Sequence, residues 1–200
     1  MNDLLRPLRA AVVSVVGLTV ICGVLYPALV LGIGTVAAPH QANGSLITHN
    51  GTVIGSSLLG QSFTDAEGKA LPQYLQGRPS AAGDAGYDGA SSSGTNYGPE
   101  NEDLIASIRE LKAEIAQREG VAEDQIPPDA VTSSSSGLDP HISMAYAEIQ
   151  VPRLAKERGI SEDEVRAIIA QHTTGRAAGL IGEERVDVLA VNMALDSRKA

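Results

Sequence analysis

Serine, aspartate and histidine occur together in one short stretch, SSSSGLDPHIS, which runs from Ser133 to Ser143. These are the residue types of a hydrolase triad, in which a serine hydroxyl is the nucleophile, a histidine takes its proton and an aspartate orients the histidine. Asp139 lies two residues before His141, with Pro140 between them. An aspartate followed by a proline is typical of a helix start, where the carboxylate accepts hydrogen bonds from free backbone N–H groups. We therefore predict that Asp139 caps a helix, and a triad that takes its members from elsewhere in the fold stays an open alternative.

The other residues that could do chemistry lack the spacing that known sites need. The chain has no G-x-S-x-G elbow, no P-loop and no H-E-x-x-H motif. The single cysteine, Cys22, excludes an internal disulfide and a cysteine-based zinc site, and the histidines are scattered at positions 40, 49, 141 and 172. A net charge of −9 disfavours nucleic acid as a partner, because phosphate binding needs a basic surface. The sequence predicts no catalytic residue, no metal ligand and no directly bound cofactor.

The N-terminal part of the chain has the composition of a membrane anchor. After Arg6 and Arg9, no Asp, Glu, Lys or Arg occurs until Asp65, and residues 10–36 are overwhelmingly apolar. A bilayer core of roughly 30 Å needs about 20 helical residues, so residues 10–36 are predicted to form a transmembrane helix. A bend is expected near Tyr26–Pro27, because proline removes a helical hydrogen bond. A signal peptide cleaved near Val36-Ala37-Ala38 is the alternative, although the apolar run is long for one.

The basic residues near the apolar run lie only on its N-terminal side. By the positive-inside rule, residues 1–9 are predicted to lie in the cytoplasm and residues 37–200 outside the membrane. Within the helix, Ala28 and Gly32 are small residues four positions apart, a spacing that lets two membrane helices approach closely. We predict that the contacts to a partner helix are Tyr26, Pro27, Ala28 and Gly32.

Residues 37–200 carry patterns of both helices and strands, which predicts a single exported α+β domain. A helix is expected at residues 101–120, where apolar residues recur at helical spacing, and another after Ser161, which can form a capping box with Glu164. A further helix is expected to begin at Leu138-Asp139-Pro140 and to be interrupted at Pro152. Residues 80–99 are expected to form a long loop, and residues 52–63 a short strand pair or an extended segment. The other strand candidates are residues 71–80, 129–136 and 185–192, the last as the central strand.

Eight blocks of the sequence, taken in order, resemble one family. They are YPALVLGIG in the apolar run, then QANGSLI, GSSLLGQSF, YLQGRPSAA, YDGASSSGTNYGPEN, AVTSSSSGLDPHIS, QVPRLAKERG and GLIGEERVDVLAVNMALD. In this order and spacing the chain resembles KdpC, the C-subunit family of the bacterial Kdp potassium-transporting P-type ATPase. The resemblance extends from the apolar run to Asp196. It implies an accessory, non-catalytic subunit of a complex in the bacterial inner membrane that takes up potassium with high affinity and is driven by ATP.

The resemblance also implies partners. These are the P-type catalytic subunit KdpB, which hydrolyses ATP, the potassium-channel-like subunit KdpA and, as a further candidate, the small subunit KdpF. Members of the family are described as catalytic chaperones that raise the ATP affinity of the hydrolysing subunit. The predicted topology leaves only residues 1–9 on the ATP side, so such an effect would have to pass through the helix or the partner subunit. We therefore expect ATP to be associated with the complex, with no cofactor bound directly by this chain.

Outside the membrane, the candidate contacts to partner subunits lie in the long loop and in the turn around Asp139. They are Tyr97, Gly137, Leu138, Asp139 and His141. The alternative function is a membrane-anchored exported serine hydrolase that uses His141 and a serine such as Ser135. The two functions differ in what the replacement of that serine would remove: a hydrolase loses its activity, whereas an accessory subunit keeps supporting potassium-dependent growth.

Overall fold

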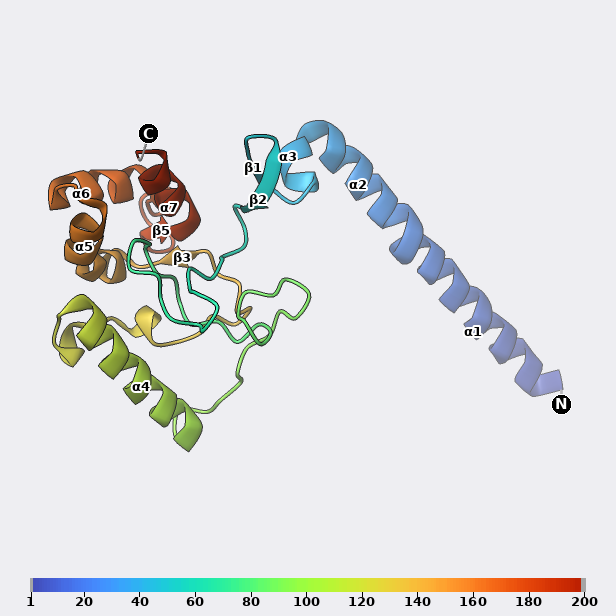
Figure 1. Cartoon of the computed structure of the whole chain (residues 1–200). Coiled ribbons are helices and arrows are strands. Elements are labelled where there is room, and N and C mark those ends of the chain that lie inside the picture. The colour runs from blue at the N-terminus through green and yellow to red at the C-terminus, as the bar shows by residue number, and fades with distance from the viewer. Residues whose placement is uncertain (1, 199–200) are drawn as a thin grey trace. The chain divides into compact units, whose positions relative to one another are not determined.

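The computed structural model describes residues 2–198, with side chains from residue 5 onward. Met1 and residues 199–200, the outermost parts of the expected cytoplasmic and exported segments, lie outside the described residues. The chain divides into two compact units, Met1–Ile54 and Gly55–Ala200. Figure 1 follows the elements of both units along the chain.

The first unit is dominated by one long apolar helix. It consists of α1 (Asn2–Val20), a π-helical turn (Ile21–Leu25) and α2 (Tyr26–Ala37), and the short α3 (Pro39–Ala42) follows it. The 33 residues from Leu5 to Ala37 are long and apolar enough to cross a membrane, for which about 20 residues suffice. The expected long apolar helix near the N-terminus is therefore confirmed.

This helix is irregular immediately before Pro27. Proline has no N–H group, so Pro27 cannot bond to the carbonyl of Gly23. The N–H of Tyr26 donates to the carbonyl of Ile21, five residues earlier rather than four, which makes this turn π-helical. A bend was expected near Tyr26–Pro27, and the structure has a wider π turn just before it.

A two-stranded hairpin follows the helix, with β1 at Leu46–His49 and β2 at Thr52–Ser56. Its turn is Asn50-Gly51, in which both residues have positive φ, 50° and 78°. Asn-Gly is the preferred sequence for such a turn, which matches the twist of the paired strands. Of the strand pair or extended segment expected at residues 52–63, only the first five residues form a strand.

Within residues 55–198, the fold contains four helices and a small antiparallel sheet. The helices are α4 (Glu102–Glu119), α5 (Met144–Arg158), α6 (Glu162–Gln171) and α7 (Val188–Ser197), with 3-10 turns at Glu123–Gln125 and Pro128–Ala130. The strands are β3 (His141–Ile142), β4 (Thr173–Thr174) and β5 (Arg185–Asp187), in the order β3-β5-β4. Val186 in the middle strand lies opposite both Ile142 and Thr173. Helices α5 and α7 contact β5, and α4 packs against α5. Figure 1 shows α5, α6 and α7 gathered at this sheet.

The core of the second unit comes mainly from the helices and the small sheet, and loop residues such as Leu75 and Val131 add to it. Tyr146, Val151 and Leu154 of α5 are at most 2 % exposed, and other deeply buried residues include Leu75, Ile115, Val165, Ile168, Ile169, Val186, Val191 and Leu195. Burial of each large apolar side chain stabilises the fold by about 1.5–3 kcal/mol. The mixed helix and strand content confirms the expected α+β class.

Two of the expected helices are confirmed together with their ends. The side chain of Asn101 caps α4 by accepting a hydrogen bond from the N–H of Leu104 at 3.0 Å, and Gly120 ends the helix with φ of 69°. Ser161 and Glu164 form the expected capping box at the start of α6. Local side-chain chemistry is sufficient to define these ends.

The helix expected at Leu138-Asp139-Pro140 does not begin there. Residues 141–142 form β3, and α5 begins only at Met144. Ser143 is its cap, because the Ser143 hydroxyl accepts a hydrogen bond from the N–H of Tyr146 at 3.0 Å. Asp129 holds Ser143 in place by accepting from its N–H at 2.7 Å and from its hydroxyl at 2.8 Å. Residues 129–136, expected as a strand, contain a 3-10 turn and bends in place of one.

Two expectations about α5 and α7 are also wrong. Pro152 lies inside α5 without ending it; the lost hydrogen bond costs about 3 kcal/mol, and burial of the neighbouring Val151 and Leu154 offsets this. The expected central strand at residues 185–192 is a strand only up to Asp187, whose side chain caps α7 by accepting from the N–H of Ala190 at 2.9 Å. A short apolar run suits a buried helix as well as a buried strand, so its pattern could not separate the two.

Candidate interaction surface

Two loop segments of the second unit, residues 77–94 and 133–141, lie against each other, and we call them the loop platform. Arg78 connects them. Its Nη1 lies 3.3 Å from Oδ2 of Asp139, and its other nitrogens donate to the carbonyls of Thr132 and Ser133 at 3.3 and 3.5 Å. Apart from the first residue of β3, neither segment lies in a helix or strand. Side chains such as Arg78 therefore supply the bonds that a sheet would otherwise provide.

Asp139 also binds His141. One carboxylate oxygen, Oδ1, accepts a hydrogen bond from the backbone N–H of His141 at 3.0 Å and lies 3.3 Å from Nδ1 of its imidazole. The hydrogen bonds from the His141 side chain and backbone, together with the charge of Arg78, hold the pKa of Asp139 below its usual value. Asp139 therefore stabilises a turn that leads into β3, in place of the helix cap that its position before a proline suggested.

Ser80 and Tyr87 fix the centre of the loop platform. The Ser80 hydroxyl donates to the carbonyl of Gly137 at 2.6 Å and accepts from the N–H of Tyr87 at 2.7 Å. The Tyr87 hydroxyl donates to the carbonyl of Arg78 at 2.7 Å. Burial raises the pKa of Tyr87 to about 12, with a further contribution from the nearby Asp139 carboxylate. Tyr87 thus acts here as a neutral hydrogen-bond donor inside the fold.

Gly137 is the point of closest approach between the two segments. Its φ is +68°, and a Cβ there would lie 2.9 Å from each of three atoms: Cβ and N of Ala82 and the carbonyl oxygen of Ser93. Only glycine fits both this conformation and this space. Close packing of the two segments therefore requires glycine at position 137, the first residue of GLDPH.

The serine run does not assemble a hydrolase triad in the described chain. The carbonyl of Ser136 accepts from the N–H of Ser93 and the hydroxyl of Ser92, at 3.1 and 3.0 Å, and the Ser136 hydroxyl accepts from the N–H of Leu138 at 3.1 Å. Of Ser133–Ser136, none has its hydroxyl bonded to the imidazole of His141 within residues 2–198. Among all the residues that the structure describes, no group of three or more His, Cys, Asp or Glu side chains is placed to hold a metal ion.

Two buried amide side chains bind the backbone immediately before the first segment of the loop platform. The backbone of Leu75 exchanges two hydrogen bonds with the side chain of Asn192, at 2.8 and 2.9 Å. The backbone of Gln76 does the same with the side chain of Gln150, at 2.8 and 3.2 Å. These contacts replace the pairing that a neighbouring strand would give, so the expected strand at residues 71–80 is an extended segment held by side chains of α5 and α7. Sequence reasoning missed both amides.

A buried ionic cluster lies next to these amides. The carboxylate of Glu119 is fully buried and accepts from Nε of Arg118 at 2.7 Å and from Nε of Arg153 at 2.8 Å. Arg118 also donates to the hydroxyl of Tyr146 at 3.2 Å, and Arg153 donates to Oε1 of Gln150 at 2.8 Å. A buried carboxylate needs such partners, because an unpaired charge in the interior is costly. The cluster therefore joins α4 to α5 and continues into the amide contacts.

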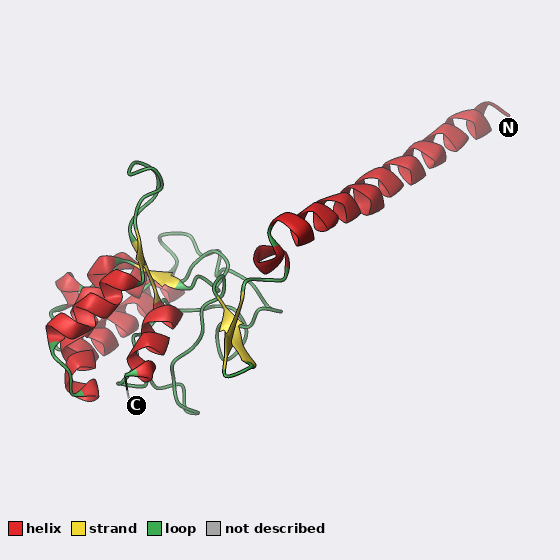
Figure 2. Cartoon of the chain, turned by 90° about the horizontal axis from the view of Figure 1, so that it is seen from above, coloured by secondary structure: helices red, strands yellow, loops and turns green. Residues whose placement is uncertain are grey.

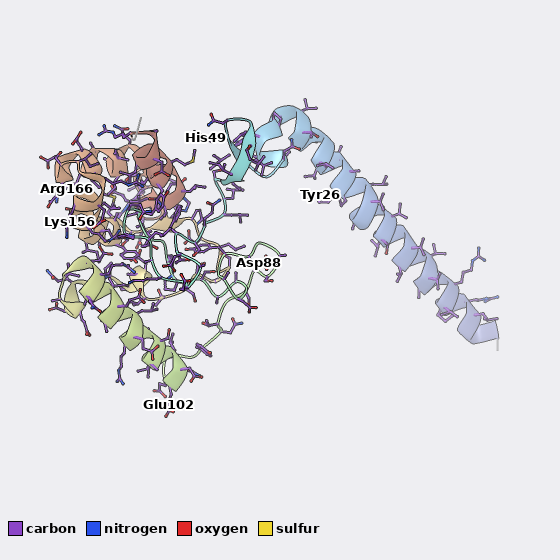
Figure 3. The ribbon with its side chains drawn as sticks, in the orientation of Figure 1. Tyr26, His49, Asp88, Glu102, Lys156 and Arg166 are labelled. Carbon is purple, nitrogen blue, oxygen red and sulfur yellow. The ribbon has the colours of Figure 1, made fainter. Side chains whose placement is uncertain are left out.

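The expected contact residues fall into two groups. Tyr26, Pro27, Ala28 and Gly32 are all exposed on α2 in the first unit, and Figure 3 shows the Tyr26 side chain projecting from the helix. In the second unit the structure brings Gly137, Leu138, Asp139 and His141 together in the platform. Of these, Gly137 and Leu138 are buried, whereas Asp139 and His141 are partly exposed. Tyr97 is 46 % exposed in the loop before α4. Their contacts with partner subunits stay predictions.

A cleft of about 660 Å³ opens beside the exposed edge of the platform. Arg78, Asp139 and His141 line one part of it, and Glu183 and Arg185 line another part, at the base of the loop that joins β4 to β5. Charges of both signs thus face one opening. This suits contact with the polar surface of another protein better than it suits enclosure of an apolar small molecule.

Comparison with known proteins identifies the family. Residues 8–197 match the family model described as "KdpC: K+-transporting ATPase, c chain". Among the relatives, proteins of Gemmatimonas aurantiaca, Sorangium cellulosum and Caulobacter vibrioides are 46, 48 and 50 % identical, each over 98 % of this chain and over 96, 100 and 95 % of the relative. Each of the three is named a potassium-transporting ATPase KdpC subunit. The chain therefore belongs to the KdpC family, the c chains of the K+-transporting ATPase.

Proposed function

We propose that this chain is an accessory, non-catalytic subunit of a bacterial complex that takes up potassium with high affinity and is driven by ATP. The observation that carries the proposal is the 33-residue apolar helix with exposed apolar side chains, joined to a separately packed unit in a chain of the KdpC family. A helix with this surface is stable only in a lipid bilayer or against other membrane helices. The second unit, in turn, supplies a platform with partly exposed polar side chains for contacts between subunits.

The helix anchors the chain in the inner membrane, with the N-terminus in the cytoplasm and the second unit outside. The support for this orientation is Arg6 and Arg9 on one flank and the lack of any charged residue from there to Asp65. In this orientation the second unit sits on the side from which potassium enters.

The partners we propose are the ATP-hydrolysing subunit KdpB and the channel-like subunit KdpA, with the small subunit KdpF as a further candidate. The exposed α2 surface around Tyr26, Ala28 and Gly32 offers small residues for close packing against a partner helix. Asp139 and His141 offer polar contacts outside the membrane.

ATP acts on this chain only indirectly in our proposal. The chain binds no cofactor itself, and it raises the ATP affinity of the hydrolysing subunit as a catalytic chaperone. With residues 37–200 outside the membrane, this effect passes through the anchor helix as a bias between conformations of the partner. Photolabelling of the intact complex with an azido-ATP tests this: label on the hydrolysing subunit alone is expected, and label on this chain contradicts the indirect route.

Co-purification from bacterial membranes tests the accessory role. Tagged full-length chain is expected to bring down a P-type ATPase subunit and a channel-like subunit, and a reporter fused after Ala200 is expected to be active only if it is exported. Recovery of the chain alone, or a reporter active only in the cytoplasm, would contradict the proposal. Ser135→Ala is expected to leave potassium-dependent growth unchanged, whereas a serine hydrolase that relies on this residue would lose its activity.

A further inference from the structure

The loop that joins β4 to β5, residues 175–184, carries two neighbouring exposed apolar side chains, Leu180 and Ile181. Leu180 is 84 % exposed and Ile181 is 72 % exposed. Among the described large apolar residues of the Gly55–Ala200 unit, the next most exposed is Leu58, at 61 %. Figure 2 shows the loop extending from the strands beyond the helices of this unit. Two adjacent apolar side chains exposed to water at the tip of a loop do not stabilise the fold, so they indicate a contact with another molecule.

The tip is an ordered turn. Ala177 and Ile181 exchange backbone hydrogen bonds at 2.8 and 3.0 Å, and the N–H of Leu180 donates to the carbonyl of Ala177 at 3.1 Å. Ala178 has φ of +52°, a conformation that is unfavourable for alanine. Backbone strain of this kind tends to occur at functional sites. The backbone that carries the two side chains is therefore ordered before any partner binds, which lowers the backbone entropy lost on binding.

Charged residues of both signs surround the tip. Arg176 precedes it, and Glu183, Glu184 and Arg185 follow it, all of them exposed. None of the four forms an ion pair within residues 2–198, whereas Arg166 and Arg198 on the surface of the same unit do. An apolar centre with a polar, unpaired rim is the usual anatomy of a protein–protein contact.

We propose that Leu180 and Ile181 insert into an apolar recess on the outer face of another subunit of the ATPase, a recess whose edge carries charges of both signs. This proposal rests on the proposed function, since it needs a partner subunit on the same side of the membrane. The two positive and two negative charges around the tip give it no net attraction for anionic lipid, and the carboxylates beside Ile181 oppose insertion into a lipid surface.

The small size of the tip is consistent with a tethered contact. Two side chains bury too little surface for a stable complex between free proteins. The anchor helix keeps this chain beside its partners, so docking of the tip is effectively intramolecular and needs little affinity of its own. The cleft beside Asp139 and His141 is lined in part by Glu183 and Arg185, which makes the tip continuous with the predicted contact edge of the platform.

Site-specific photocrosslinking in the assembled complex tests the proposal. A photoreactive amino acid replaces Leu180 in the full-length chain, and the matched control carries it at Ala167, an exposed residue of α6 away from the loop platform. After irradiation of native membranes, position 180 is expected to crosslink to another subunit of the complex and position 167 is not. Crosslinks from position 180 to lipid only, to a second copy of this chain only, or to nothing overturn the proposal.

A second measurement tests whether the apolar tip itself makes the contact. With the photoreactive residue placed at Glu184, the double change Leu180→Asp and Ile181→Asp is expected to lower the crosslink to the partner subunit about tenfold or more. Ala167→Asp, which adds a charge at an exposed position of α6, is expected to leave the crosslink unchanged in the same background. An unchanged yield in the double variant overturns the proposal. If wild-type chain co-purifies with the ATPase and these crosslinks fail, only the docking is wrong; if wild-type chain does not co-purify, the proposed function fails as well.

Discussion

Replacement of Gly137 by alanine tests whether the loop platform is packed as closely as its geometry indicates. Alanine at a φ of +68° is in the left-handed region, which costs about 1–2 kcal/mol. The added Cβ would also lie 2.9 Å from Cβ and N of Ala82 and from the carbonyl oxygen of Ser93. Two of these three neighbours are backbone atoms and cannot rotate away, so the two segments must separate. Forcing an extra carbon into a packed site costs about 1–3 kcal/mol more.

The expected loss for Gly137→Ala is therefore about 2–5 kcal/mol in the free energy of unfolding, the sum of the two contributions. Gly159→Ala is the matched control. Gly159 has φ of +66°, and nothing lies within 4 Å of a Cβ built there. Only the backbone contribution of about 1–2 kcal/mol applies to it. The difference between the two variants thus isolates the contact between the platform segments.

Urea denaturation of the full-length chain in detergent, followed by circular dichroism of the helices, gives both values. Gly137→Ala is expected to have the lower midpoint of the two variants. Equal midpoints for Gly137→Ala and Gly159→Ala would refute the reasoning, because they would mean that Ala82 and Ser93 do not restrict the space at Gly137. A folded Gly137→Ala chain that fails to assemble with its partners would show that this turn matters for docking beyond its packing.

Three further predictions concern groups that the fold buries or pairs. Gln150→Leu leaves the N–H and carbonyl of Gln76 without partners in the interior, so urea denaturation is expected to show a loss of about 2–4 kcal/mol; a neutral effect would mean that the backbone finds other partners. Glu119→Gln removes the buried carboxylate shared by Arg118 and Arg153 and leaves Arg118, among the described carboxylates, only its exposed partner Glu114. A loss of about 3–5 kcal/mol is expected in the same assay, against a small effect for Glu114→Gln, whose side chain is 60 % exposed. The pKa of Asp139 is lowered in the fold, so its contribution to stability is present above pH 3.8, the ordinary value, and is lost as the pH falls below it. Unfolding curves of wild type and Asp139→Asn are expected to converge at acid pH, and a difference that does not change with pH would contradict this.

The parts of the fold that local side-chain chemistry defines were predictable. The ends of α4 follow from Asn101 and Gly120, and the start of α6 follows from the capping box of Ser161 with Glu164. The apolar helix was predictable for the same kind of reason, because its length and lack of charge are properties of one continuous segment. In each case the residues that decide the structure lie within a few positions of the element itself.

Asp139 shows why a correct local signal can still lead to a wrong element. An aspartate before a proline does accept hydrogen bonds from the backbone that follows it, and Asp139 does so from the N–H of His141. Whether a helix continues from that point is decided by Asp129, which positions Ser143 as the cap instead. Asp129 precedes Ser143 by fourteen positions, and nothing in the turn itself indicates the contact.

The backbone at Leu75–Gln76 is likewise fixed by side chains that lie even farther away in the sequence. Its apolar and polar residues suit a strand, and its backbone is indeed extended and fully paired, but the partners are the side-chain amides of Asn192 and Gln150 rather than another strand. Those amides are 117 and 74 positions away in the sequence. A buried amide on a helix reads in a sequence as an ordinary polar residue, because only the packed fold shows which backbone it meets. The loop platform also depends on contacts between distant residues, because Arg78 and Ser80 bind the segment around Gly137 and Asp139 and neither segment has regular structure there. In this chain, therefore, the elements follow from neighbouring residues, whereas the surface most suited to meeting a partner depends on side chains that bond backbone far along the chain.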